Sequence, residues 1–75
     1  MLKTKLRTLK DDGGYVYLKN LIYDKDIRIS HFSLGSYLVE YLDKTKGEWC
    51  HDITFKPFLN IKEIITYYSG YFIVG

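Results

Sequence analysis

The stretch that decides the predicted fold spans residues 32–47 and has the sequence FSLGSYLVEYLDKTKG. Its apolar residues recur with the spacing of one face of an α-helix. They are Leu34, Tyr37, Leu38, Tyr41 and Leu42. A helix of this length is not stable alone in water, so other elements must cover its apolar stripe. We therefore expect one main amphipathic helix over residues 32–47, packed on a sheet formed by the rest of the chain.

Both ends of this stretch carry helix signals. Ser33 can accept a hydrogen bond from the first turn, and Phe32 and Tyr37 have the spacing of a hydrophobic staple. At the other end, Lys44 suits the negative end of the helix dipole. Gly47 can then take the left-handed conformation that ends a helix. The sequence thus predicts both boundaries of the helix from local features.

Alternating residues predict strands on both sides of this helix. In residues 2–9, leucine and threonine alternate with lysine and arginine, as in a half-buried strand. A turn over residues 11–14 leads to a second strand over 15–23, and a three-residue loop between the two gives one consistent apolar face. Shorter alternating segments predict strands over residues 27–29 and 48–55. We expect the sheet to include an N-terminal hairpin or meander.

The last part of the chain predicts a second helix and a final strand. Asn60 and Glu63 have the spacing of a capping box, and Gly70 can end the helix. Residues 71–74 then form a last extended segment. The predicted order is β-β-β-α-β-α-β. The predicted fold class is α+β, a small and mostly antiparallel sheet covered by one main helix, in a single domain over residues 1–75.

Composition limits the classes of protein to consider. An apolar content of 47% with 27% charged residues indicates a folded chain. A lone Cys50 cannot form an internal disulfide, which fits a reducing compartment. The start of the chain does not resemble a signal peptide, and no apolar run approaches the roughly 20 residues of a membrane helix. We expect a cytoplasmic protein that does not bind a membrane.

The amino-acid usage also suggests an origin. The 75 residues include eight tyrosines but no alanine and no glutamine. A chain rich in Lys, Ile, Tyr and Asp is typical of A/T-rich coding sequence, as in many phages and low-GC bacteria. We therefore expect an A/T-rich coding sequence, and if that sequence belongs to a phage or another mobile element, we expect an inhibitor or regulator of a host protein.

Residue spacing gives no support to catalysis or metal binding. Cys50 and His51 are adjacent in a predicted strand, so their side chains point to opposite faces and cannot act as a nucleophile and base together. Neither they nor His31 show a spacing typical of zinc ligands. The sequence also lacks a glycine-rich phosphate loop and a nucleophile elbow. We predict no enzyme activity, no catalytic residues, no metal site and no cofactor.

Aromatic residues crowd the C-terminal end and support the leading hypothesis. Tyrosine and tryptophan bring large contact areas to protein interfaces. We therefore expect a small, non-enzymatic interaction module that binds a protein partner stoichiometrically, as an inhibitor or regulator of a host protein. The last strand could also pair with its own copy in a homodimer. The predicted partner-binding residues are Tyr67, Tyr68, Tyr71, Phe72 and Trp49.

The first hairpin supports an alternative, single-stranded nucleic-acid binding. On a sheet surface, tyrosine rings can stack on bases while nearby cations contact phosphates. The formal net charge of +2 is small for such a role. The two hypotheses, a protein partner first and a nucleic acid second, stay open on the sequence alone. The residues of the alternative site are Lys3, Lys5, Arg7, Tyr15, Tyr17 and Lys19.

Overall fold

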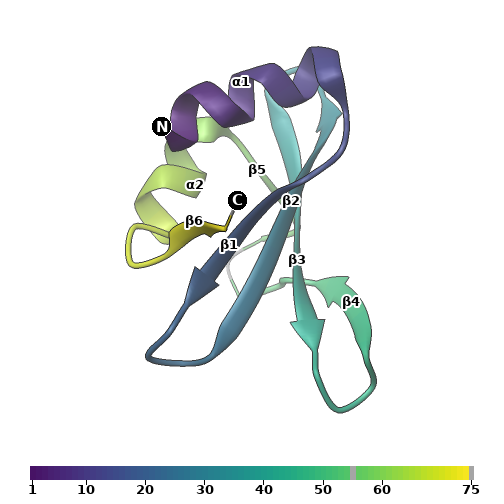
Figure 1. The fold of residues 1–75 in the computed structure, drawn as a ribbon. Helices are drawn as coiled ribbons and strands as arrows, with labels where there is room; N and C mark the ends of the chain where they lie inside the picture. The colour runs from purple at the N-terminus through teal and green to yellow at the C-terminus, as the bar shows by residue number, and fades with distance from the viewer. Residues whose placement is uncertain (55, 75) are drawn as a thin grey trace.

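The computed structural model describes residues 1–54 and 56–74, which form two helices and one antiparallel sheet (Figure 1). This architecture confirms the predicted fold class, although not the placement of the helices. The elements in chain order are α1 (Leu2–Asp12), β1 (Val16–Asn20), β2 (Lys25–Ser33), β3 (Ser36–Asp43), β4 (Glu48–His51), β5 (Phe58–Leu59), α2 (Ile61–Tyr67) and β6 (Phe72–Val74).

The sheet is a meander to which a distant strand returns. Within the described residues the strand order is β4-β3-β2-β1-β6, and the short β5 also pairs with β3. After α2 the chain returns to place β6 beside β1, with Ile73 opposite Leu18. Figure 1 shows α1 and α2 together at one end of the molecule, with the β1–β2 and β3–β4 hairpins projecting at the other. Thus β4 and β6 form the two edges of this strand order.

The main predicted helix is wrong, because residues 32–47 form two strands and their turns. Ser33 of β2 pairs with Ser36 of β3 across a two-residue turn. Gly35 in that turn has a φ of 72°, a conformation that suits glycine. In β3, Tyr37 and Val39 are buried on one face while Leu38 is partly buried on the other. A strand that is apolar on both faces can mimic the helical spacing, and this produced the error.

The predicted strand over residues 2–9 is also wrong, because this segment is helix α1. Leu2, Leu6 and Leu9 follow the helical spacing i, i+4, i+7 and all pack on the core. Gly13, with a φ of 71°, ends the helix and donates its N–H to the Leu9 carbonyl oxygen at 2.9 Å. The predicted N-terminal hairpin therefore does not form, and β1 pairs with β2 and β6 instead.

The other predicted elements are found at or near their expected positions. Strands β1 and β6 lie within the predicted segments, and β2 is longer than the predicted strand over 27–29. The strand predicted over residues 48–55 ends at His51 as β4, and Phe55 lies outside the described residues. The capping box of α2 is confirmed. Asn60 Oδ1 accepts the Glu63 N–H at 2.8 Å, and Glu63 Oε1 accepts the Asn60 N–H at 3.0 Å.

The hydrophobic core lies between the two helices and one face of the sheet. Because α1 and α2 both contribute to it, they cover the same face, and no described helix packs on the opposite face, which we call the open face. No helix in residues 1–54 or 56–74 is long and apolar enough to span a membrane. The core residues are Leu6, Leu9, Val16, Leu18, Ile27, Ile29, Tyr37, Val39, Leu59, Ile64 and Tyr68.

One carboxylate is buried beside this core. Asp52, 1% exposed, follows β4 and accepts a hydrogen bond from the Tyr68 hydroxyl at 2.8 Å. Its other oxygen accepts the Thr54 N–H at 3.1 Å, and Lys25 Nζ lies 3.4 Å away. Burial by itself raises the pKa of Asp52, but the hydrogen bonds from Thr54 and Tyr68 and the charge of Lys25 together lower it. Asp52 is therefore held as a carboxylate that links Lys25 of β2, Tyr68 at the C-terminal end of α2 and the segment after β4.

Candidate functional site: an aromatic and arginine cluster on the open sheet face

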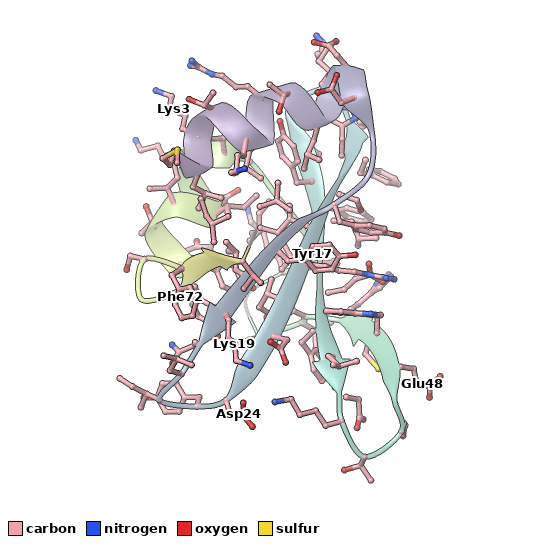
Figure 2. The ribbon with its side chains drawn as sticks, in the orientation of Figure 1. Lys3, Tyr17, Lys19, Asp24, Glu48 and Phe72 are labelled. Atoms are coloured by element: carbon pink, nitrogen blue, oxygen red, sulfur yellow. The ribbon has the colours of Figure 1, made fainter. Side chains whose placement is uncertain are left out.

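The open face carries polar and aromatic residues that alternate with the buried ones. In β1, Tyr17 lies between the buried Val16 and Leu18, and it is opposite Arg28 of β2. Arg28 is in turn opposite Glu40 of β3. Successive side chains of a strand point to opposite faces, so these residues point away from the helices. Figure 2 labels Tyr17 near the middle of the sheet.

Arg28 is at the centre of a stack of side chains. Its guanidinium carbon lies 4.4 Å from the ring centre of Tyr15 and 4.7 Å from that of Trp49. Its Nε donates to Glu40 Oε1 at 2.8 Å, and its Nη2 donates to Oε2 at 3.4 Å. The hydrogen bond to Glu40 raises the pKa of Arg28 above its ordinary value. Arg28 is thus fixed by a carboxylate and by two aromatic rings.

Tyr17 extends the stack into a continuous surface. Its ring centre lies 5.9 Å from that of Tyr15 and 6.1 Å from that of Trp49. Tyr15 and Tyr17 are 43% and 41% exposed, and Trp49 is half-buried. We call Tyr15, Tyr17, Arg28 and Trp49 the Arg28 cluster. These four side chains therefore contact one another and form one surface on the open face.

The cations around the Arg28 cluster are balanced by carboxylates. Arg28 pairs with Glu40, and Lys19 lies 3.7 Å from Asp26 and 4.0 Å from Asp24. Figure 2 shows Lys19 and Asp24 toward the hairpin end of the sheet. This part of the open face therefore presents aromatic area with paired charges rather than a strongly positive surface.

Two of the predicted partner-binding residues lie on the open face. Trp49 belongs to the Arg28 cluster. Phe72 of β6 is 46% exposed and opposite Lys19, so it points to the same face. Val74 of β6 is opposite Tyr17 and is equally exposed. The final strand thus borders the cluster instead of forming a separate aromatic site.

The other three predicted partner-binding residues do not lie on the open face with Trp49 and Phe72. Tyr67 lies on α2 and is 38% exposed, while Tyr71 is partly buried against the core. The prediction that Tyr68 is an exposed contact residue is wrong, because it is 2% exposed and its hydroxyl bonds to Asp52. Since a tyrosine can bury its ring when its hydroxyl finds a partner inside, aromatic crowding alone did not identify the surface.

The structure divides the residues predicted for nucleic-acid binding. Tyr17 and Lys19 belong to β1 and Tyr15 directly precedes it, whereas Lys3, Lys5 and Arg7 lie on α1. Lys5 lines a shallow pocket of about 190 Å³ together with Tyr15 and Tyr17. Lys3 and Arg7 line a different groove, between α1 and α2. The single basic face depended on a strand over residues 2–9, so it does not form.

Arg28 and Glu40 are site residues that the sequence-based reasoning missed. Arg28 lies between Ile27 and Ile29, and this alternation indicates that it points away from the core. Glu40 could be recognised as its partner only once β2 and β3 were paired, and residues 32–47 were predicted as a helix. The missing information was therefore the strand register.

Cys50 and His51 point to opposite faces of the sheet, as predicted. Cys50 is opposite Tyr41 of β3, and His51 is opposite Glu40. Within residues 1–54 and 56–74, no group of three or more His, Cys, Asp or Glu side chains is arranged to hold a metal ion.

Comparison of the chain with protein-family models, with curated proteins and with solved structures finds no match.

Proposed function

We propose that this chain is a non-enzymatic interaction module that binds a protein partner stoichiometrically through the Arg28 cluster. The observation that carries the proposal is the stack of Tyr15, Arg28 and Trp49, joined by Tyr17, on a sheet face that no described helix covers. Tryptophan, tyrosine and arginine are the residues most enriched at the energetic centres of protein interfaces. Of the residues predicted from sequence for partner binding, this proposal keeps Trp49 and Phe72.

The surroundings of the cluster also suit a protein partner. Phe72 and Val74 add apolar area beside Tyr17, and the ion pairs of Lys19 provide a polar border. An apolar centre with a polar rim is the usual anatomy of a protein interface. Because Arg28 is hydrogen-bonded to Glu40 and lies against the rings of Tyr15 and Trp49, its side chain would need little rearrangement on binding.

Nucleic-acid binding at the same face has weaker support. Arg28 is hydrogen-bonded to Glu40, and Lys19 is paired with acidic residues, so neither cation is available for a phosphate without losing a partner. Base stacking uses the faces of aromatic rings, and Arg28 already lies over one face of Tyr15 and of Trp49. Nucleic-acid binding, a homodimer through the C-terminal strand, a phage origin and an inhibitory role stay predictions.

The proposal is tested by capturing a partner with two matched variants. Tyr17→Thr removes an exposed ring of the cluster, while Tyr23→Thr removes a ring that is 77% exposed in the turn before β2. The tagged wild-type chain and Tyr23→Thr should recover the same protein from lysate, with or without nuclease. With that protein purified, Tyr17→Thr should weaken the affinity at least tenfold, as for a residue at the centre of an interface.

The circular dichroism spectra of both variants should match the wild type, so that a loss of binding is not a loss of fold. Capture that disappears after nuclease treatment, or an affinity that Tyr17→Thr leaves unchanged, would overturn the proposal.

A further inference from the structure

A second surface lies on the helical side of the molecule, in a groove between α1 and α2. The groove has a volume of about 370 Å³. Figure 2 shows Lys3 on α1, at the end of the molecule away from Lys19 and Asp24. The groove is separated from the Arg28 cluster by the sheet, because both helices pack on the opposite face. Its lining residues are Lys3, Arg7, Ile61, Lys62, Ile65 and Thr66.

The floor of this groove is apolar and continues into a second hollow. Ile61 and Ile65 lie one helical turn apart on α2 and both line the groove. A neighbouring hollow of about 380 Å³ shares Lys3 and Ile65 with it and is also lined by Met1, Leu2, Tyr68, Ser69 and Tyr71. Two hollows with a shared wall can receive two successive apolar side chains of one bound segment. The shape therefore suits a peptide-like occupant with apolar residues at helical spacing.

The rim of the groove is positively charged. Lys3 and Arg7 extend from α1, and Lys62 extends from α2. Among the described residues, none of these three cations lies within salt-bridge distance of a carboxylate. The acidic residue of α2, Glu63, instead pairs with Lys56 and caps the helix. A rim of unpaired cations attracts carboxylates on an incoming segment.

We propose that the α1–α2 groove binds an acidic amphipathic segment of a protein, with its apolar side chains on Ile61 and Ile65 and its carboxylates at Lys3, Arg7 and Lys62. This site is separate from the Arg28 cluster and does not depend on the function proposed for it. Charge complementarity around an apolar floor is the observation that identifies this occupant.

Two other anionic occupants fit the groove less well. A single-stranded nucleic acid requires exposed ring faces for stacking. The groove between Lys3 and Lys62 has an aliphatic floor, and the tyrosines of the neighbouring hollow, Tyr68 and Tyr71, are buried or partly buried against the core. An anionic membrane is contacted by a broad apolar face, whereas this groove offers only Ile65, which is 38% exposed, and Ile61, which is partly buried against the core. Both are therefore outcomes that the experiment must distinguish.

The test uses a fluorescein-labelled synthetic peptide with leucines at helical spacing and glutamates at the remaining positions. Its binding to the purified chain is measured by fluorescence anisotropy at low and high salt. The affinity should fall as salt rises, because the rim charges become screened. A scrambled peptide of the same composition, which has no apolar face, should bind at least tenfold more weakly.

Variants of the chain separate the groove from general charge attraction. The double variant Arg7→Glu/Lys62→Glu should lower the affinity for the peptide at least tenfold. Ile65→Ser should lower this affinity at both salt concentrations. Lys46→Glu is the matched control, since Lys46 is exposed in the turn between β3 and β4 and should leave the affinity unchanged. Tyr17→Thr should also leave it unchanged, which separates this proposal from the Arg28 cluster.

Three results would overturn the proposal: no peptide binding at low salt, equal binding of the scrambled peptide, or equal effects of Lys46→Glu and the groove variants. Tighter binding of oligothymidylate or of phosphatidylserine vesicles, lost in Arg7→Glu/Lys62→Glu, would assign the groove to a nucleic acid or a membrane instead.

Discussion

At the scale of single residues, Tyr68 and Asp52 show how a polar group decides whether an aromatic side chain is buried or exposed. The Tyr68 ring packs in the core while its hydroxyl donates to Asp52 Oδ2 at 2.8 Å. Burial, and then the hydrogen bond to Asp52, raise the pKa of Tyr68 far above its ordinary value. A buried carboxylate is stable only with such partners, and Lys25 and Thr54 provide the others.

Tyr68→Phe should destabilise the fold without changing its shape. The substitution removes a hydrogen bond to a buried carboxylate, so we expect a loss of about 1–3 kcal/mol in the free energy of unfolding. Urea denaturation measures this value. Tyr23→Phe, at an exposed tyrosine, is the control and should stay within about 0.5 kcal/mol of the wild type. Equal effects of the two variants would contradict the assigned role of Tyr68.

Asp52 should also make stability depend on pH in the acid range. Its pKa in the folded chain lies below the ordinary value of 3.8, so the folded state favours the ionised form. This contribution to stability is fully present above that ordinary value and is lost as the pH falls through the folded-state pKa. Urea denaturation at several pH values should show the loss beginning near pH 4 and continuing below it.

The variant Asp52→Asn should be less stable at neutral pH and should show a smaller loss in acid. The exposed Asp24 and the partly buried Glu63, whose pKa values are lowered by hydrogen bonds from Lys44 and Lys56, titrate in both proteins. The difference between the two pH curves therefore isolates Asp52. Parallel curves would mean that Asp52 does not carry the dependence.

At the scale of elements, the sequence predicted correctly where the signals are local. Helix α2 was predicted because Asn60 and Glu63 form a capping box within four residues. The strands within residues 32–47 were not predicted, because the residues of β3 match both a helical and an alternating period. Only pairing with β2 and β4, which are separate segments of the chain, selects the strand. Long-range contacts therefore decided what local periodicity could not.

Substitution of Gly35 tests the structure of residues 32–47, because a turn and a helix predict changes of opposite sign in the free energy of unfolding. In the turn between β2 and β3 its φ is 72°, so Gly35→Ala should cost about 1–2 kcal/mol in the free energy of unfolding. If residues 32–47 were helical, the same change would stabilise the chain by about 1 kcal/mol.

Gly70→Ala is the control for Gly35→Ala. The added Cβ would lie 3.7 Å from Asn20 Nδ2, an ordinary contact, and the φ of Gly70 is not in the left-handed region. Gly70→Ala should therefore be neutral or slightly stabilising in the same urea titration.

The capping box predicts a graded loss of stability at the start of α2. Asn60→Ala removes the side-chain acceptor of the Glu63 N–H and should cost about 1 kcal/mol. Asn60→Gly should lower the free energy of unfolding by only a few tenths of a kcal/mol, because a glycine at the N-cap leaves the unpaired N–H groups of the first helical turn open to water. Thermal or urea unfolding distinguishes the two variants. The reverse order of stability would contradict the capping role.

The candidate site was only partly predictable for the same reason as the fold. Tyr15, Tyr17 and Trp49 were each recognised as aromatic residues of interest, but in two separate predicted sites. They meet because β1, β2 and β3 pair in one register and β4 joins them. Arg28, which holds the rings together, has no sequence signal beyond its alternation with Ile27 and Ile29.

At the scale of the whole molecule, the Arg28 cluster and the α1–α2 groove lie on opposite sides of one sheet. Contacts at surfaces that share no residues are usually additive within about 0.5 kcal/mol. We therefore predict that saturation with the acidic peptide changes the affinity for the captured partner by no more than about twofold. Calorimetric titration of the partner, with and without the peptide, measures this. A larger change would indicate coupling through the sheet.

The stacking of Trp49 against Arg28 also gives the molecule an optical property. The chain contains one tryptophan, and its indole lies in the Arg28 cluster, beside a cation and close to Tyr17. Indole emission moves to shorter wavelength when water is displaced from the ring. Occupation of the open face should therefore be visible in the unlabelled protein as a blue shift, whereas occupation of the helical groove should leave the emission maximum where it was.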